Sequence, residues 1–261
     1  MAFDREGSVC KARRMRIGIL GGTGPAGSAL AARLASVGYH AVIGSRSRYR
    51  AMEARDSQVE KWPELASRLG FGDNAAAADC DIVVIATPWD SAATTAQENS
   101  VAMEGKIVIS MANALVRVGH EFQPLVPPRG SVAAHVQAAV PRCRVVAAFH
   151  HLPATELGHI GQPIDSDVLI CGDDPEAVRT ISELVSKIPG CRPLDSGELS
   201  NATAIEAFTA VLLQLNVRYK TRVAPKLTGI KSDPRLPKPA ADQAPSNSEP
   251  CLLYTSPSPR D

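Results

Sequence analysis

A glycine-rich turn between an apolar strand and a helix is the feature that most constrains this sequence. It follows the apolar run 15–20, and its residues are Gly22, Thr23, Gly24, Pro25, Ala26 and Gly27. In a G-x-G-x-x-G pattern the first glycine makes the tight turn, and the second lets the backbone approach a pyrophosphate. The third allows close packing of helix on strand, and the helix N-terminus supplies amide donors. Because the pattern stands between a strand and a helix, we predict that these six residues bind a dinucleotide.

Strand and helix patterns alternate along most of the chain. Apolar runs predict strands at 15–20, 40–43, 81–86, 106–110, 144–149 and 167–171. Helical patterns follow at 26–37, 48–69, 90–99, 131–139, 174–188 and 199–222. Continuous apolar strands separated by helices indicate a parallel sheet that is covered on both faces. We therefore expect an α/β fold, a Rossmann-type doubly wound parallel sheet with a small C-terminal helical portion.

Composition separates a central folded part from two dissimilar ends. Residues 1–14 are polar and lack periodicity, so we expect a disordered extension. Residues 231–261 are rich in proline and serine, which bury too little apolar surface to offset the entropy of ordering. The end of this tail resembles translated adapter sequence, so we expect it to be disordered and non-native. Between the ends we expect a Rossmann domain at 15–195 and a helical portion at 196–230, whose apolar helix could form a dimer contact.

Charge and cysteine content exclude several classes of function. The 261 residues hold 28 Lys and Arg against 27 Asp and Glu, and only 4% are aromatic. A near-neutral chain with few aromatic residues is not expected to bind nucleic acid over a broad surface. No apolar stretch approaches the roughly 20 residues of a membrane span, so no membrane partner is expected. The six cysteines form no CxxC pair, which favours buried reduced thiols and a cytoplasmic protein.

The end of the second predicted strand indicates which dinucleotide would bind. NAD-binding proteins place a carboxylate there to hold the ribose 2′-hydroxyl. This chain instead has Ser45 and Arg46, with Arg48 and Arg50 close behind. Guanidinium groups bind phosphate through charge-assisted hydrogen bonds, so the pattern predicts NADP(H). A solvated basic start of a helix is the alternative.

Two further strand ends carry candidate site residues. Thr87 and Pro88 follow the run 81–86, where they would either border the cofactor or form an ordinary turn. His150 and His151 follow the run 144–149. Adjacent histidines on an extended segment point in opposite directions, so we expect no metal site. A structural pair and a cofactor-site role for His150 both stay open.

Five segments together resemble the NADPH-dependent coenzyme F420 reductases, also called F420-dependent NADP oxidoreductases. They read RIGILGGTGPAGSALAARLASVGYHAVIGSR, VVIATPW, AFHHLPA, VLICGDD and CRPLDSGELSNATAIEAF, and they span about residues 15 to 230. The resemblance implies NADP(H) and coenzyme F420 as cofactors, a homodimer, and direct hydride exchange between nicotinamide C4 and deazaflavin C5. It also implies that Ser45, Arg46 and Arg50 or Arg48 contact the 2′-phosphate. His150 and Leu152 would line the place where the two rings meet, with no acid–base pair.

The sequence departs from the family pattern in two places. Pro25 stands where archaeal relatives carry Asn, and residues 111–116 differ from the Ser-Pro-Leu-Val segment of some members. Arg117 and Arg129 are candidates for binding the anionic tail of the deazaflavin. Two alternatives stay open: an NADPH-dependent reductase of another acceptor (a flavin, a metal chelate or an imine), and a non-catalytic NADP(H)-binding sensor.

Overall fold

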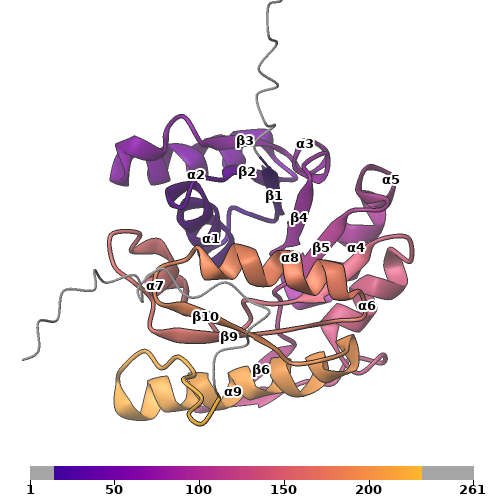
Figure 1. The fold of residues 1–261 in the computed structure, drawn as a ribbon, viewed down its shortest axis with the longest axis vertical. Helices are drawn as coiled ribbons and strands as arrows, with labels where there is room; N and C mark the ends of the chain where they lie inside the picture. Colours follow the sequence, from indigo (N-terminus) through magenta and orange to yellow (C-terminus); the bar gives the residue numbers. More distant parts are fainter. Residues whose placement is uncertain (1–14, 231–261) are drawn as a thin grey trace, which may run out of the picture.

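The computed structural model describes residues 15–230, which form an eight-stranded sheet with helices on both faces (Figure 1). The strand order is β10-β9-β8-β5-β4-β1-β2-β3. The strands are β1 (Arg16–Leu20), β2 (His40–Ser45), β3 (Leu69–Asp73), β4 (Ile82–Ile85), β5 (Ile107–Ser110), β8 (Arg144–Ala147), β9 (Ser166–Gly172) and β10 (Cys191–Asp195). From β3 to β8 every pair is parallel, and the order reverses at β1 as in a doubly wound fold.

The prediction of a parallel sheet is wrong at one junction. β9 runs antiparallel to β8, with Val146 opposite Gly172, while β10 is parallel to β9. A parallel pair needs a connection that crosses back over the sheet, usually through a helix. The connection from β8 to β9 holds only the five-residue α7 (Ala154–Gly158), which packs on α1 instead of crossing the sheet. The chain therefore returns antiparallel.

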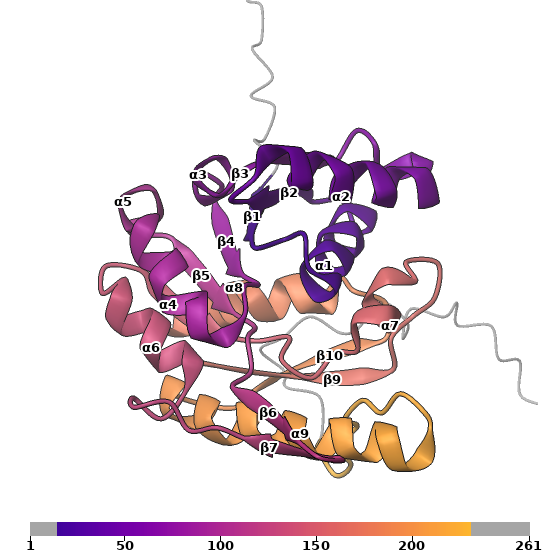
Figure 2. The same ribbon diagram turned by 180° about the vertical axis from the view of Figure 1, so that it is seen from behind.

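Apolar side chains on both faces of the sheet explain why the strands read as continuous apolar runs. Along β4, Ile82 and Val84 join the core beneath α1 (Pro25–Ser36), α2 (Arg48–Lys61) and α8 (Pro175–Ser186). Val83 and Ile85 join the opposite core. That core is covered by α3 (Asn74–Ala78), α4 (Trp89–Glu98), α5 (Ser100–Met103) and α6 (Val132–Ala139). α8 crosses the front of the sheet in Figure 1, whereas α4 and α6 come forward in Figure 2.

A hairpin and a long helix lie together below the sheet (Figure 2). The hairpin is β6 (Leu115–Val118) with β7 (Glu121–Pro124), and α9 (Ala202–Tyr219) packs against β7 and α6. Short 3-10 turns at Pro63–Leu65 and Leu199–Asn201 complete the elements. The predicted helix 48–69 ends early, at Lys61, because Pro63 cannot donate to a continuing helix.

Three further points concern the chain ends, the domain boundary and membrane spans. The proposed disordered ends, 1–14 and 231–261, lie outside the described residues. The boundary at residue 195 stays a prediction. Among residues 15–230 no helix is long and apolar enough to cross a membrane.

Candidate nucleotide-binding site

Close packing explains two of the three glycines of the turn, Gly22 and Gly27. The Gly22 amide donates to Gly44 O at 2.9 Å, which ties the turn to β2. A Cβ on Gly27 would lie 2.9 Å from Gly22 Cα, so any larger residue there would push α1 away from the turn. A Cβ on Gly24 would meet only Gly21 O, at 3.8 Å. Packing therefore does not require glycine at position 24, and its bare backbone leaves the surface of the turn open.

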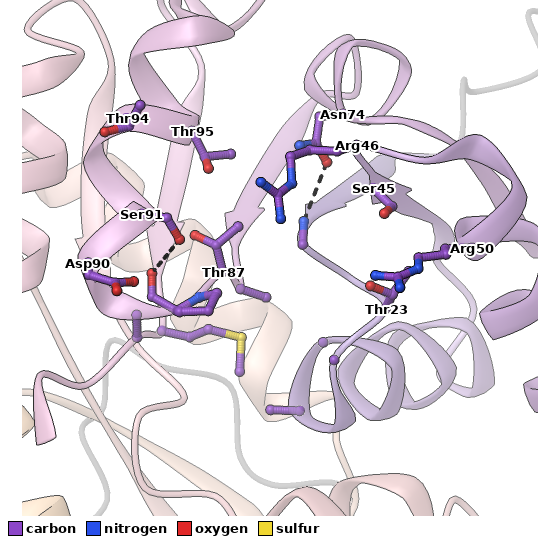
Figure 3. Close-up of a pocket in the computed structure, with 18 of the residues that line it drawn as sticks. Thr23, Ser45, Arg46, Arg50, Asn74, Thr87, Asp90, Ser91, Thr94 and Thr95 are labelled. Atoms are coloured by element: carbon purple, nitrogen blue, oxygen red, sulfur yellow. Dashed lines mark hydrogen bonds between the residues drawn. The ribbon is translucent and has the colours of Figure 1, made fainter. Parts of the chain in front are cut away.

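A cleft of about 840 Å³ lies above this turn, at the carboxyl ends of the strands where the sheet order reverses (Figure 3). Open α/β sheets hold their ligands at this place. The structure brings nearly all the predicted cofactor residues to its walls: Thr23, Gly24, Pro25, Ala26, Gly27, Ser45, Arg46, Arg50, Thr87 and Pro88. Gly22 belongs to the turn but does not line the cleft.

The wall formed by the end of β2 is basic. Arg46 and Arg50 are exposed and line the cleft, and neither guanidinium forms a salt bridge or hydrogen bond within residues 15–230. Arg48 does not reach the cleft, because its guanidinium lies over the Phe71 ring at 5.6 Å. Of the two residues considered as a third phosphate contact, Arg50 lines the cleft, and its contact with a phosphate stays a prediction. Ser47 supports this wall by capping α2, accepting a hydrogen bond from the Arg50 amide at 3.4 Å.

The opposite wall was not predicted from the sequence. One polar stripe of α4 forms it, with Ser91, Thr94, Thr95 and Glu98 on one face and Asp90 at the helix start. Their spacing of three and four residues is a helical signal that could have been recognised once Thr87 was placed at the cleft. Asn74, the first residue of α3 directly after β3, also lines the cleft. It had no such signal, because β3 itself was missed.

His150 lies outside the residues that line the cleft. Its side chain is fully buried, and neither ring nitrogen has a hydrogen-bond partner within residues 15–230. Burial lowers the pKa of His150 from 6.5 to about 3, so the ring is neutral at physiological pH. The residue before it, Phe149, adopts a left-handed backbone with φ of 66°, and Asn113 donates to the His150 carbonyl at 2.9 Å. This strained, pinned segment fixes the imidazole in place.

Glu206, which the sequence did not single out, faces His150 from α9. Its carboxylate accepts hydrogen bonds from the Val132 and Ala133 amides at 2.8 and 3.0 Å, so it caps α6 from another element. Oε1 of Glu206 is 4.0 Å from Nε2 of His150. Burial raises the pKa of Glu206 to about 7. The His150 ring and the Glu206 carboxyl group are therefore both uncharged over much of the acidic pH range.

His150 and His151 lie in a turn, not on the extended segment that the sequence suggested. Nε2 of His151 lies 2.9 Å from the Asp167 carbonyl, and burial lowers the pKa of His151. Within residues 15–230 no group of three or more His, Cys, Asp or Glu side chains is placed to hold a metal ion.

Leu152 is buried in the core, and the segment that follows it is held by Arg33 of α1. The fully buried Arg33 guanidinium donates to five backbone carbonyls, those of Glu156, Leu157, His159, Ile160 and Gln162, at 2.8 to 3.2 Å. Arg33 thus connects the helix of the glycine-rich turn to the loop after His150 and Leu152. Arg117 bonds Gly119 O in the hairpin, and neither it nor Arg129 lines the cleft.

Several known proteins can be aligned with this chain over most of its length. Residues 16–114 match the family described as NADP oxidoreductase, coenzyme F420-dependent. An F420-dependent NADP reductase of Methanocaldococcus jannaschii is 36% identical over 222 residues, covering 83% of this chain and 97% of that protein. This chain belongs to the F420-dependent NADP oxidoreductase family. The reductase of the same name from Methanothermobacter marburgensis is 32% identical over 80% of this chain and 96% of its own length.

A solved structure shares the fold of this family member. It is a protein from Arthrobacter sp. FB24 described as F420-dependent NADP-reductase-like, with 26% identity and a TM-score of 0.67. The match covers 81% of this chain and all of the other. The similarity extends well beyond the glycine-rich turn, to the segments that carry His150 and Glu206.

Proposed function

We propose that this protein transfers a hydride between NADP(H) and coenzyme F420. The observation that carries the proposal is the cleft itself. A glycine-rich turn with an open surface meets two exposed, unpaired guanidinium groups there, in a chain of this family. When bound, the nicotinamide and deazaflavin rings supply the redox chemistry, one hydride passing between C4 and C5 while one proton is exchanged with solvent.

The residues of the cleft fit the phosphates of NADP(H). The first-turn amides of α1 have no partner within their helix and can donate to the pyrophosphate above Gly24. Arg46 and Arg50 can neutralise the 2′-phosphate, because no carboxylate within residues 15–230 pairs with them. The β2 wall offers NADH, which has no 2′-phosphate, none of this attraction. Selectivity for NADP(H) follows from the same two side chains.

The reacting rings would meet at the far end of the cleft. Met111 and Ala112, just beyond β5, line that end of the cleft. The next residue, Asn113, donates a hydrogen bond to the backbone carbonyl of His150. We propose that His150 and Leu152 support the rings and keep water away from them, with no acid–base step assigned to either side chain. A neutral histidine in a rigid segment suits this role, since hydride transfer depends on the distance and alignment of the two rings.

Two substitutions test the two ends of the cleft separately. Loss of deazaflavin absorbance would be followed with NADPH and with NADH. Arg46→Ala should raise the KM for NADPH by about tenfold or more and leave the KM for F420 unchanged. His150→Ala should slow turnover while NADPH still binds. Equal effects of Arg46→Ala on both cofactors would refute the 2′-phosphate role, and unchanged turnover of His150→Ala would leave that residue structural.

The acceptor needs its own control. Riboflavin and FMN would be offered in place of F420 to the same enzyme. Rapid oxidation of NADPH by F420 with slow oxidation by the flavins supports the proposal. NADPH that binds without being oxidised by F420 would contradict it.

We also propose a homodimer in the cytoplasm. Val211 and Val217 of α9 and Val118 of the neighbouring hairpin are about half exposed, an apolar surface that a second copy could cover. The four cysteines within residues 15–230 are all buried and free, as in a reducing compartment. Sedimentation of the wild type and of Val211→Lys would test the dimer.

A further inference from the structure

Asn74 stands beside the basic wall of the cleft, on an element that the sequence did not reveal. In the sheet, Ser45 of β2 pairs with Asp73 of β3, so the next residue of each strand end, Arg46 and Asn74, projects from neighbouring positions. Both line the cleft, and Figure 3 shows their side chains next to each other above the turn.

The two ends of the Asn74 amide differ in what they contact. Its Oδ1 accepts a hydrogen bond at 3.5 Å from the amide of Gly21, the residue directly before the glycine-rich turn, which has a φ of 73°. Its Nδ2 has no hydrogen-bond partner within residues 15–230, although the side chain is half-buried. Because the oxygen is directed to Gly21, the amide donor is left for the cleft.

The position also suits an anion because the nearby carboxylates are turned away or lie on the opposite wall. The neighbouring carboxylate, Asp73, is turned away to cap α3, where it accepts from the Ala76 amide at 2.8 Å. Carboxylates at the cleft, Asp90 and Glu98, come from the opposite wall. A neutral donor therefore stands beside Arg46 on the basic wall of the cleft.

From this geometry we infer that Asn74 is a specificity-determining residue for the 2′-phosphate side of NADP(H). It steadies the start of the turn through Oδ1 and donates from Nδ2 to the phosphorylated ribose. This role rests on the proposed function, of which it concerns only the NADP(H) half.

Two variants separate donation from support of the turn. Asn74→Asp keeps an oxygen for the Gly21 amide, but it removes the donor and places a negative charge beside Arg46. Asn74→Ala removes both contacts. Thr94→Asp is the matched control, since it adds the same charge to the opposite wall of the cleft. Full-length proteins would be titrated calorimetrically with 2′,5′-ADP (adenosine 2′,5′-bisphosphate) and with 5′-AMP, ligands that differ only in the 2′-phosphate.

The ratio of the two dissociation constants is the deciding quantity. In the wild type 2′,5′-ADP should bind more tightly, and Asn74→Asp should reduce that preference by about tenfold or more. Asn74→Ala should weaken both ligands and reduce the preference less. Thr94→Asp should weaken both ligands alike and keep the ratio. If the wild type prefers 2′,5′-ADP and Asn74→Asp keeps the full preference, Asn74 only supports the turn. A wild type without any preference would overturn the NADP(H) assignment and the Asn74 role with it.

Discussion

The buried His150 should make the stability of this protein depend on pH in a way that a single substitution can isolate. Its pKa is about 3 in the folded protein, against 6.5 for an exposed histidine, because burial disfavours the charged ring. Between these two values the unfolded chain binds a proton that the folded chain does not. The free energy of unfolding contributed by His150 is therefore fully present above pH 6.5 and is lost as pH falls.

The expected size follows from the linkage relation. One proton of difference changes the free energy of unfolding by about 1.4 kcal/mol per pH unit. From pH 6.5 to about 3 the loss from His150 alone is on the order of 5 kcal/mol. Glu206 acts in the opposite sense, because its raised pKa makes its contribution present below pH 4.5 and lost as pH rises through about 7. The wild-type curve between pH 4.5 and 6.5 is accordingly flattened.

The substitution His150→Gln removes the titrating ring while Glu206 stays in both proteins. Urea unfolding of wild type and variant would be measured at pH 7.0, 6.0 and 5.0, and the difference between their free energies of unfolding plotted against pH. We expect this difference to change by about 1.4 kcal/mol per unit below pH 6.5, to the disadvantage of the wild type. A difference that stays constant over this range would refute the argument that His150 is buried and neutral.

Two further predictions concern the elements around the turn. Arg33→Met leaves five backbone carbonyls without their donor and should lower the free energy of unfolding by about 3 kcal/mol or more; hydrogen exchange should accelerate in residues 156–162, and unchanged protection there would contradict it. Gly27→Ala should reduce both stability and NADPH affinity, because its Cβ would lie 2.9 Å from Gly22 Cα. Gly24→Ala should keep the melting temperature and lose NADPH affinity, since its Cβ would enter only the cleft; equal melting temperatures for the two variants would count against this reasoning.

The sequence predicted the half of the site that local chemistry encodes. A turn motif and the residues at the end of the next strand lie within 30 positions of each other, so Gly24, Ser45 and Arg46 could be assigned from residue types and spacing alone. The structure brings them to one cleft, and their cofactor contacts stay a prediction. Arg48 and Arg50 could not be separated in this way, because only the packing of Arg48 on the Phe71 ring removes it from the cleft.

Elements without a clear apolar pattern were missed. β3 contains Gly70 and Gly72, which leave it no run of apolar side chains, although a Cβ at Gly72 would lie 2.8 Å from Ala76 Cβ. β10 contains Pro193, which is tolerated because this strand forms the edge of the sheet. Because β3 was not predicted, Asn74 directly after it was not recognised as a site residue either. Missing a strand thus left one wall residue of the site unrecognised.

The contacts around His150 depend on residues far away in the chain. Glu206 lies 56 positions further on, and no spacing rule connects the two. The family resemblance indicated that His150 matters, whereas its burial, its neutral state and its neighbour came only from the structure.

The two ends of the cleft differ in the kind of binding energy they can supply. Arg46, Arg50 and Asn74 would contact a phosphate that does not change during hydride transfer, so they stabilise the bound cofactor and the transition state equally. Such uniform binding lowers KM and leaves kcat unchanged. His150 and Leu152 do not line the cleft, and they would support the reacting rings from within the core, where a small displacement alters ring alignment and therefore kcat. At the β2 wall the cations are exposed and unpaired, which gives attraction at a distance, whereas His150 has a buried neutral imidazole in a pinned backbone, which gives fixed geometry.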